Sequence, residues 1–249
     1  MNDTIKVISN HRSIRKFKKE PLTTDQIHTI IGAAQQASTS SYVMAYTVIG
    51  ITDETVKAKL KEVSGQEYVE ENGHFFVFCA DLNRIYQQAS AEEQKAMQES
   101  LESTEQFLVS TIDTALVAQN TVIAAESMGL ATCYIGSLRN NINRVNDILE
   151  LPDYVVPLFG MAVGYPDENP DRKPRLPIEV VYHENKYNKD RQFQQKLIDS
   201  FNEELKMYYQ TRSKNTRTDT WSEQMVRKYK KAIRMDVTTF IKNKKLNKR

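Results

Sequence analysis

The sequence is poor in glycine and cysteine, and the motifs that it lacks exclude several common kinds of binding site. Its eight glycines form neither a G-x-G-x-x-G nor a G-x-x-x-x-G-K-S/T pattern, so neither a dinucleotide-binding Rossmann half nor a P-loop is indicated. The patterns G-x-S-x-G, H-E-x-x-H and C-x-x-C are also missing, and these accompany hydrolase, zinc and redox sites. A phosphate-bearing ligand would therefore have to be held by side-chain cations.

The two cysteines, Cys79 and Cys133, both lie in apolar, strand-like runs. Buried free thiols are the simpler interpretation of such positions, and a disulfide or a metal pair is the alternative. His74 has no second His or Cys at metal-ligand spacing, so no metal site is predicted. Residues 1–13 contain no apolar run of signal-peptide length. Together these features predict a cytoplasmic protein.

Charge is unevenly distributed along the 249 residues. The net charge is +2, but residues 206–249 hold 14 Lys and Arg against 3 Asp and Glu, or +11, while residues 1–205 hold 20 against 29, or −9. We therefore expect a globular body at 1–205 and a basic helical extension at 206–249 that belongs to the same domain. Such an extension could serve nucleic acid, a membrane surface, an acidic partner or a phosphate-bearing cofactor.

Residues 108–128 predict one long central helix, followed at once by a buried strand at 129–136. Apolar residues take 12 of the 21 helical positions and spread almost all round the axis, so we expect burial on every side. Its length would suit a membrane, but Asp113 and Glu126 lie within it, and such groups are costly in hydrocarbon. We predict a core helix of a soluble protein, with a second subunit as the hypothesis that covers its remaining face.

Periodicity and turn residues predict the remaining elements. A segment rich in proline, residues 165–177, contains four of the seven prolines and is expected to be extended. Helices are predicted at 4–10, from 25 to 34, at 53–63, at 91–105, from 142 to 149 and from 190 onward, and strands at 46–52, 75–80, 157–163 and 178–182.

Three polar clusters are candidate ligand contacts. Residues 11–17 combine cations and a serine with Ile14 and Phe17, which can anchor the backbone. This combination is typical of a phosphate-binding hook, and a solvated basic turn is the alternative interpretation. Residues 38–41 offer several hydroxyls, either as a capping turn or as contacts to a polyol or ring edge. The segment 173–177 presents a lysine and an arginine on a backbone that its prolines stiffen.

Seven short motifs, spread over nearly the whole chain, carry a family resemblance. They are His11-Arg-Ser-Ile-Arg15, Ser38-Thr-Ser-Ser41, Tyr134-Ile-Gly136, Leu138-Arg-Asn-Asn141, Lys173-Pro-Arg175, Thr211-Arg212 and Asp219-Thr-Trp221. In combination they closely resemble the nitroreductase family, in its NADPH-preferring branch of oxygen-insensitive nitroreductases and flavin reductases.

The resemblance implies an α+β fold with a mixed, mainly antiparallel sheet flanked by helices. It also implies an intertwined homodimer that packs on long central helices and binds one FMN in each of two sites at the interface. The residues that it assigns to FMN are His11, Arg12, Ser13, Arg15, Thr39, Ser40, Ser41, Gln66, Tyr134, Ile135, Gly136, Ser137, Lys173 and Arg175.

Some of these assignments carry a role. By resemblance the cations of residues 11–15 bind the phosphate and ribityl groups, and Arg15 points towards the N1/O2 edge of the flavin. Gln66 stands in a turn that is one residue shorter than the family's. Thr39 replaces a family serine and keeps its hydroxyl, whereas Ser137 adds a side chain where the family has a second glycine.

The activity implied is an FMN-dependent transfer of hydride from NADPH, by ping-pong turnover, to nitroaromatic, quinone, flavin or disulfide-type acceptors. No catalytic acid or base is needed, and Arg15 would act by stabilising negative charge near N1 and O2. In the basic segment 212–217, Arg212 and Arg217 match the family's arginines that contact NADPH, with a solvated basic loop as the alternative. The alternative function is a non-catalytic protein that binds nucleic acid through its basic tail.

Overall fold

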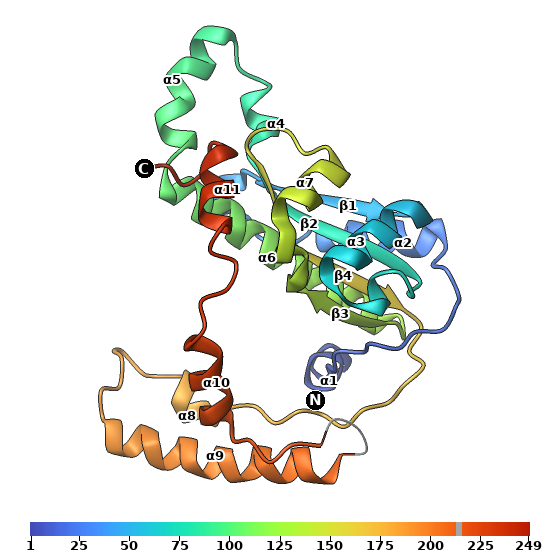
Figure 1. Ribbon diagram of the computed structural model, residues 1–249, viewed down its shortest axis with the longest axis vertical. Coiled ribbons are helices and arrows are strands. Elements are labelled where there is room, and N and C mark those ends of the chain that lie inside the picture. The colour runs from blue at the N-terminus through green and yellow to red at the C-terminus, as the bar shows by residue number, and fades with distance from the viewer. Residues whose placement is uncertain (213–215) are drawn as a thin grey trace. The chain divides into compact units, whose positions relative to one another are not determined.

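The computed structural model describes residues 1–212 and 216–249, so part of the basic segment 212–217 lies outside the described residues. Contacts between residues divide the chain into two compact units (Figure 1). Unit 1 comprises Met1–Asn169 and Arg234–Arg249, and unit 2 comprises Pro170–Ile233. The expected boundary after residue 205 falls inside a helix, and the idea that residues 206–249 do not fold independently stays a prediction.

A four-stranded antiparallel sheet forms the centre of unit 1, with the strand order β1-β2-β4-β3. On the outer edge of β3, Ser13 forms a parallel bridge to Thr132, so the pairing is mixed but mainly antiparallel. The strands are β1 (Tyr46–Ile51), β2 (His74–Asp81), β3 (Ala131–Ile135) and β4 (Val155–Gly164).

Helices cover both faces of this sheet, and the predicted α+β class is confirmed. The helices of unit 1 are α1 (Asp3–Ser9), α2 (Thr24–Ala34), α3 (Glu54–Ser64), α4 (Asn83–Tyr86), α5 (Ala91–Leu101), α6 (Thr104–Ser127), α7 (Ile142–Leu149) and α11 (Val237–Asn243). Short 3-10 helices occur at η1 (Ser40–Tyr42), η2 (Glu67–Val69) and η3 (Gly136–Asn141).

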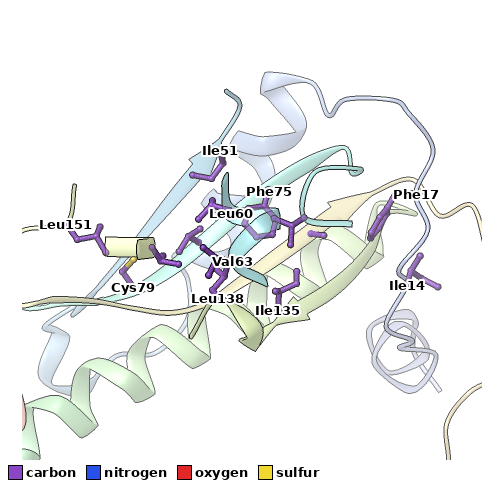
Figure 2. Packing of buried hydrophobic residues seen from close by; sticks show 14 of the residues in the cluster. Ile14, Phe17, Ile51, Leu60, Val63, Phe75, Cys79, Ile135, Leu138 and Leu151 are labelled. Atoms are coloured by element: carbon purple, nitrogen blue, oxygen red, sulfur yellow. The ribbon is translucent and has the colours of Figure 1, made fainter. Parts of the chain in front are cut away.

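The buried strand β2 explains how one sheet supports two cores. Its side chains alternate between the faces, so that Phe75, Val77 and Cys79 join one cluster while Phe76 and Phe78 join another. The first cluster packs against α3 and α7, as Figure 2 shows for Leu60, Val63 and Phe75. The second packs against α2 and α6. Both cysteines are free and buried, as the sequence predicted.

The long helix α6 begins four residues earlier than predicted, because Ser103 caps it and accepts a hydrogen bond from the N–H of Gln106. The prediction that it is buried on all sides is wrong for the single chain. Leu108, Ile112 and Leu116, at successive four-residue spacing, are 48%, 54% and 43% exposed. They form an apolar stripe on the outer face of the helix.

By length and composition α6 could also cross a membrane, and it is the one such helix among the described residues. This is weak evidence, because the core helix of a soluble protein passes the same test. Asp113, in the middle of α6, is fully buried and accepts hydrogen bonds from the backbone N–H groups of Ser40 and Ala45. The helix is thereby tied into unit 1 through a charged group.

The last residues of the chain are fastened to unit 1. Lys244 is buried and donates through Nζ to Asn146 Oδ1 at 3.0 Å and to the carbonyl of Leu151 at 2.7 Å. Lys248 and Arg249 reach the buried carboxylate of Glu102, at 3.2 and 3.5 Å. Several cations of the basic tail therefore serve the fold.

Unit 2 is helical, with α8 (Ile178–Val181), α9 (Arg191–Thr211) and α10 (Trp221–Tyr229). The strand predicted at 178–182 is wrong. Its β-branched residues suggested a strand, but the N–H of Tyr182 bonds to the carbonyl of Ile178 at 2.8 Å, which closes a helical turn. Helix α9 follows its capping residue Asp190, next to the helix start predicted at residue 190, and residues 168–177 form no helix or strand.

Candidate functional site

The basic hook at residues 11–17 is docked against the outer edge of the sheet. Ser13 bridges to Thr132 in parallel, and the N–H of Ile14 donates to the carbonyl of Thr132 at 3.1 Å. Ile14 and Phe17 are 5% and 7% exposed, so they anchor the backbone as the sequence predicted. The hook therefore runs beside β3 and is held there by main-chain and apolar contacts.

Glu126, near the C-terminal end of α6, links this hook to the sheet. Its carboxylate Oε1 accepts a hydrogen bond from His11 Nδ1 at 2.7 Å and another from the Thr132 hydroxyl at 2.9 Å. The side chain of Glu126 is 12% exposed, which strengthens these bonds relative to water. One carboxylate thus fixes the start of the hook and the start of β3 together.

The two arginines of the hook meet the residues that follow β4. The Arg12 guanidinium donates to Asn169 Oδ1, and the backbone N–H of Arg15 donates to Glu168 Oε1 at 2.6 Å. The Arg15 side chain interacts with the phenol of Tyr68. Burial raises the pKa of that phenol, and the Arg15 charge opposes the shift.

Gln66 is brought to the same region by the turn after α3. Gly65 caps the C-terminal end of α3, and its φ of +67° is left-handed and suits glycine. Gln66 then opens η2 and lies two residues before Tyr68, which contacts Arg15 and Cys133. The Gln66 turn, the hook and β3 are therefore neighbours.

The segment at the end of β3 supplies an apolar wall. Ile135 is 2% exposed, whereas the Tyr134 ring is partly open and packs edge-on against Phe159 with ring centroids 5.4 Å apart. Gly136 begins η3 over the guanidinium of Arg139, which a Cβ at this position would meet at 3.2 Å. Ser137 follows and is half-buried.

The hydroxyl cluster at Ser38–Ser41 belongs to a different part of unit 1. Asp113 accepts the N–H of Ser40 at 2.9 Å and that of Ala45 at 3.1 Å, so it holds both ends of the loop. Between them Ser41, Tyr42 and Met44 have positive φ values of 47°, 59° and 52°. Such backbone is uncommon outside glycine, and strain of this kind concentrates at functional sites.

Helix α6 sets the distance between the hydroxyl cluster at Ser38–Ser41 and the hook at residues 11–17. Asp113 holds the hydroxyl loop and Glu126 holds the hook, and they stand thirteen residues apart on the same helix. At 1.5 Å per residue their backbone positions are about 20 Å apart. Thr39, Ser40 and Ser41 are therefore not brought together with the hook of the same chain.

In unit 2, cations from separate segments gather around one aromatic ring. Lys173 Nζ lies 5.6 Å from the ring centroid of Tyr209, and the guanidinium carbons of Arg212 and Arg217 lie 5.3 and 5.4 Å from it. The Arg175 guanidinium donates to the backbone carbonyl of Lys173 at 2.7 Å.

The sequence identified the ligand-type residues and missed the residues that hold them. The hook, the Gln66 turn and the end of β3 come together in unit 1, and Lys173 joins Arg212 and Arg217 in unit 2. Glu126 and Asp113 lie within a helix that the sequence predicts to be buried, and nothing in their spacing indicates partners far away in sequence.

Known proteins are similar to this chain over nearly its whole length. The pattern of the "Nitroreductase family" matches residues 8–165, and that of the "Nitroreductase family, C-terminal domain" matches residues 173–249. An "FMN reductase (NADPH)" of Bacillus subtilis (strain 168) is 48% identical over 249 residues, which is 100% of both chains.

Solved structures with similar folds include two oxidoreductases. The NfrA1 nitroreductase of B. subtilis superposes with a TM-score of 0.94 at 48% identity, covering 99% of this chain and 100% of the other. An NADPH:FMN oxidoreductase of Vibrio harveyi, complexed with NAD+, gives a TM-score of 0.89 at 38% identity and covers 100% of both chains.

Proposed function

The chain belongs to the nitroreductase family, and from this premise we propose that it is an FMN-dependent oxidoreductase which takes hydride from NADPH. The observation that carries the proposal is the docking of a cationic hook against β3, beside the apolar wall at its end. Cations and hydroxyl groups beside an aromatic and aliphatic wall are the chemistry that a phosphorylated flavin needs. The residues present therefore fit FMN.

The hook would hold the polar part of the cofactor. His11, Arg12 and Ser13 supply donors for the phosphate and ribityl oxygens, and charge-assisted bonds of this kind each contribute roughly 1.5–3 kcal/mol. By family resemblance, we also assign Lys173 and Arg175 to the FMN phosphate. The apolar wall of Tyr134, Ile135 and Gly136, together with the half-buried Ser137, would face the ring.

Arg15 and Gln66 would serve the pyrimidine side of the flavin. When bound, FMN supplies a ring that accepts hydride from NADPH and passes electrons to an acceptor. Arg15 would place positive charge beside N1 and O2, where negative charge gathers on reduction. Gln66, held close to Arg15 by the turn that contains Tyr68, would add an amide hydrogen bond. No catalytic acid or base is assigned.

We infer that the working unit is a homodimer whose partner completes each site. The hydroxyl loop of one chain lies about 20 Å along α6 from its own hook, so a second α6 running in the opposite direction would bring its loop to that hook. The exposed apolar stripe of Leu108, Ile112 and Leu116 supports packing along this helix. Thr39, Ser40 and Ser41 would then contact the FMN held mainly by the other subunit.

The same family premise assigns the reductant and the class of acceptor. Arg212 and Arg217 would bind the 2′-phosphate, the group that distinguishes NADPH from NADH. We propose nitroaromatics, quinones, free flavins or disulfide-type compounds as acceptors, because an open ring face selects flat, electron-poor molecules. We also infer a cytoplasmic location, which two free, buried thiols support.

Part of the basic tail is already engaged in contacts within unit 1, which weighs against the alternative of nucleic-acid binding. Lys244, Lys245, Lys248 and Arg249 are engaged with acceptors and carboxylates of unit 1. Cations that serve the fold in this way are poorly placed to track a phosphate backbone.

Anaerobic titration of the FMN-loaded protein with NADPH tests the function. We expect the flavin absorbance to bleach stoichiometrically and to return when a quinone is added. A protein that cannot be loaded with FMN, or that keeps its flavin oxidised under excess NADPH, would contradict the proposal.

A further inference from the structure

The five residues that follow β4, residues 165–169, pair with the hook, and we call them the clasp. Phe17 of the hook forms an antiparallel bridge to Pro166. The N–H of Asp167 donates to the carbonyl of Lys16 at 2.9 Å, and the Asp167 carboxylate forms an ion pair with the Lys16 ammonium at 2.6 Å. The hook therefore contacts both β3 and the clasp.

Two side chains of the clasp also accept hydrogen bonds from the hook. Glu168 Oε1 accepts the main-chain N–H of Arg15 at 2.6 Å, and Asn169 Oδ1 accepts from the Arg12 guanidinium. The Arg15 guanidinium itself interacts with the phenol of Tyr68. The contact with Glu168 thus uses none of the guanidinium donors of Arg15 that we assign to the flavin.

The clasp is also the covalent link to unit 2. The first stretch of unit 1 ends at Asn169, and unit 2 begins at Pro170. Docking of the clasp on the hook therefore fixes the point at which the chain enters unit 2. Unit 2 holds the two arginines that we assign to NADPH, so the segment that binds the hook leads directly into the unit that we assign to the nucleotide.

The contacts of the clasp are largely open to water. The side chains of Lys16 and Asp167 are 62% and 44% exposed, and Asn169 is exposed as well. Exposed ion pairs stabilise little, and segments held by such contacts open locally at a low cost in free energy. The clasp can therefore exchange between a docked and an open state, and a ligand that orders the hook favours the docked one.

We propose that the clasp couples the two cofactor sites, with Glu168 as the positioning residue that keeps it docked on the hook. The inference rests on the proposed use of FMN and NADPH, and it adds a regulation of that same site. FMN on the hook favours the docked clasp, which restricts the start of unit 2 and lowers the entropy lost when NADPH binds. Because coupling between binding sites is reciprocal, NADPH raises the affinity for FMN by the same factor.

Calorimetry with adenosine 2′,5′-bisphosphate measures this coupling, because the probe lacks the nicotinamide ring that would meet the flavin directly. We expect FMN-loaded wild type to bind the probe about fivefold more tightly than the apoprotein, or better. In Glu168→Ala this factor should fall to about one, whereas Glu168→Gln keeps an oxygen for the Arg15 N–H and should stay within about twofold of the wild-type factor. Glu20→Ala removes an exposed charge just beyond the hook and is the matched control.

Hydrogen exchange gives a second measurement, which needs no FMN. In the wild-type apoprotein, the probe alone should slow exchange of the Asp167 N–H about threefold or more, because the nucleotide favours the docked clasp. In Glu168→Ala this protection should be lost. The coupling is therefore measurable even in a variant that binds FMN too weakly to be loaded.

Equal probe affinities of the apo and FMN-loaded wild type would overturn the inference. The proposed function would stand in that case, because bleaching of the flavin by NADPH tests it separately. Weaker probe binding in the presence of FMN, together with tighter FMN binding by Glu168→Ala, would show that Glu168 competes with FMN for the hook and would also overturn it. Equal factors in Glu168→Ala and Glu20→Ala would remove Glu168 from the coupling.

Discussion

Glu126 accepts a hydrogen bond from His11 at 2.7 Å, across 115 positions of sequence. The same oxygen accepts the hydroxyl of Thr132 on β3, so the C-terminal end of α6 fixes the hook to the sheet. Glu126 lies at the start of the proposed FMN site without belonging to a motif of ligand-type residues. We infer that Glu126 orders the hook before FMN binds, which would lower the entropy lost on binding.

We predict that Glu126→Ala weakens FMN binding about tenfold or more, because the hook loses the acceptor that orients His11 and the Thr132 hydroxyl loses its partner. Glu126→Gln keeps one oxygen and should have a smaller effect. Fluorescence titration of the apoprotein with FMN measures both. Glu105→Ala, an exposed glutamate on the same helix, is the control and should bind as wild type. Equal FMN affinity in Glu126→Ala and Glu105→Ala would contradict this role.

The sequence predicted most elements because their signals are local. The continuous apolar run of β2, the Asp53 cap of α3 and the helical spacing in α2 each depend on a few neighbouring residues. The strand predicted at 178–182 failed for the same reason. Val and Ile favour strands only when a partner strand packs beside them, and here the backbone closes a local turn instead.

The candidate site could be predicted only in part. Motifs pointed to the cations and hydroxyls, but the contacts that hold them, such as Asp113 with Ser40 and Glu126 with His11, join residues far apart in sequence. No periodicity encodes such pairs. The gathering of Lys173, Arg212 and Arg217 at Tyr209 is likewise a product of tertiary folding.

Because of His74, we predict that the free energy of unfolding falls in mild acid. Burial, and secondarily the Lys57 charge, lowers the pKa of the His74 ring to about 4, and its buried Nε2 has no hydrogen-bond partner among the described residues. The unfolded chain binds the proton near pH 6.5, whereas the folded chain resists it until about pH 4. Unfolding is therefore favoured as the pH falls through this window, by about 3 kcal/mol in total.

Denaturant unfolding at a series of pH values measures this effect. His74→Gln cannot bind the proton, so its unfolding free energy should depend less steeply on pH between 6.5 and 4. His28→Gln removes an exposed histidine and should keep the wild-type slope. An unchanged slope in His74→Gln would assign the acid sensitivity to other groups.

The buried contacts of Lys244 predict that the basic tail stabilises the fold. Its ammonium group satisfies Asn146 Oδ1 and the carbonyl of Leu151 from a buried position, and burial lowers its pKa. Lys244→Ala would leave these acceptors unpaired, and we expect the unfolding free energy to fall by about 1–3 kcal/mol. Lys242→Ala, an exposed lysine of α11, should stay within about 0.5 kcal/mol of wild type. Chemical denaturation compares the two, and equal stability would show that the tail cations are dispensable.

The apolar stripe on α6 links subunit association to cofactor binding. Ile112 is 54% exposed in the single chain and stands one residue before Asp113, which holds the hydroxyl loop. Ile112→Lys would place a charge in the proposed dimer contact, where an unpaired buried charge is strongly unfavourable. We expect the dimer to weaken at least a hundredfold and FMN occupancy to fall with it, because each site would lose Ser40 and Ser41 of the other subunit. Analytical ultracentrifugation and flavin absorbance on the same samples measure both quantities. Ile112→Leu preserves the apolar surface and should remain dimeric and yellow, whereas a monomeric Ile112→Lys with full FMN occupancy would refute a site shared between subunits.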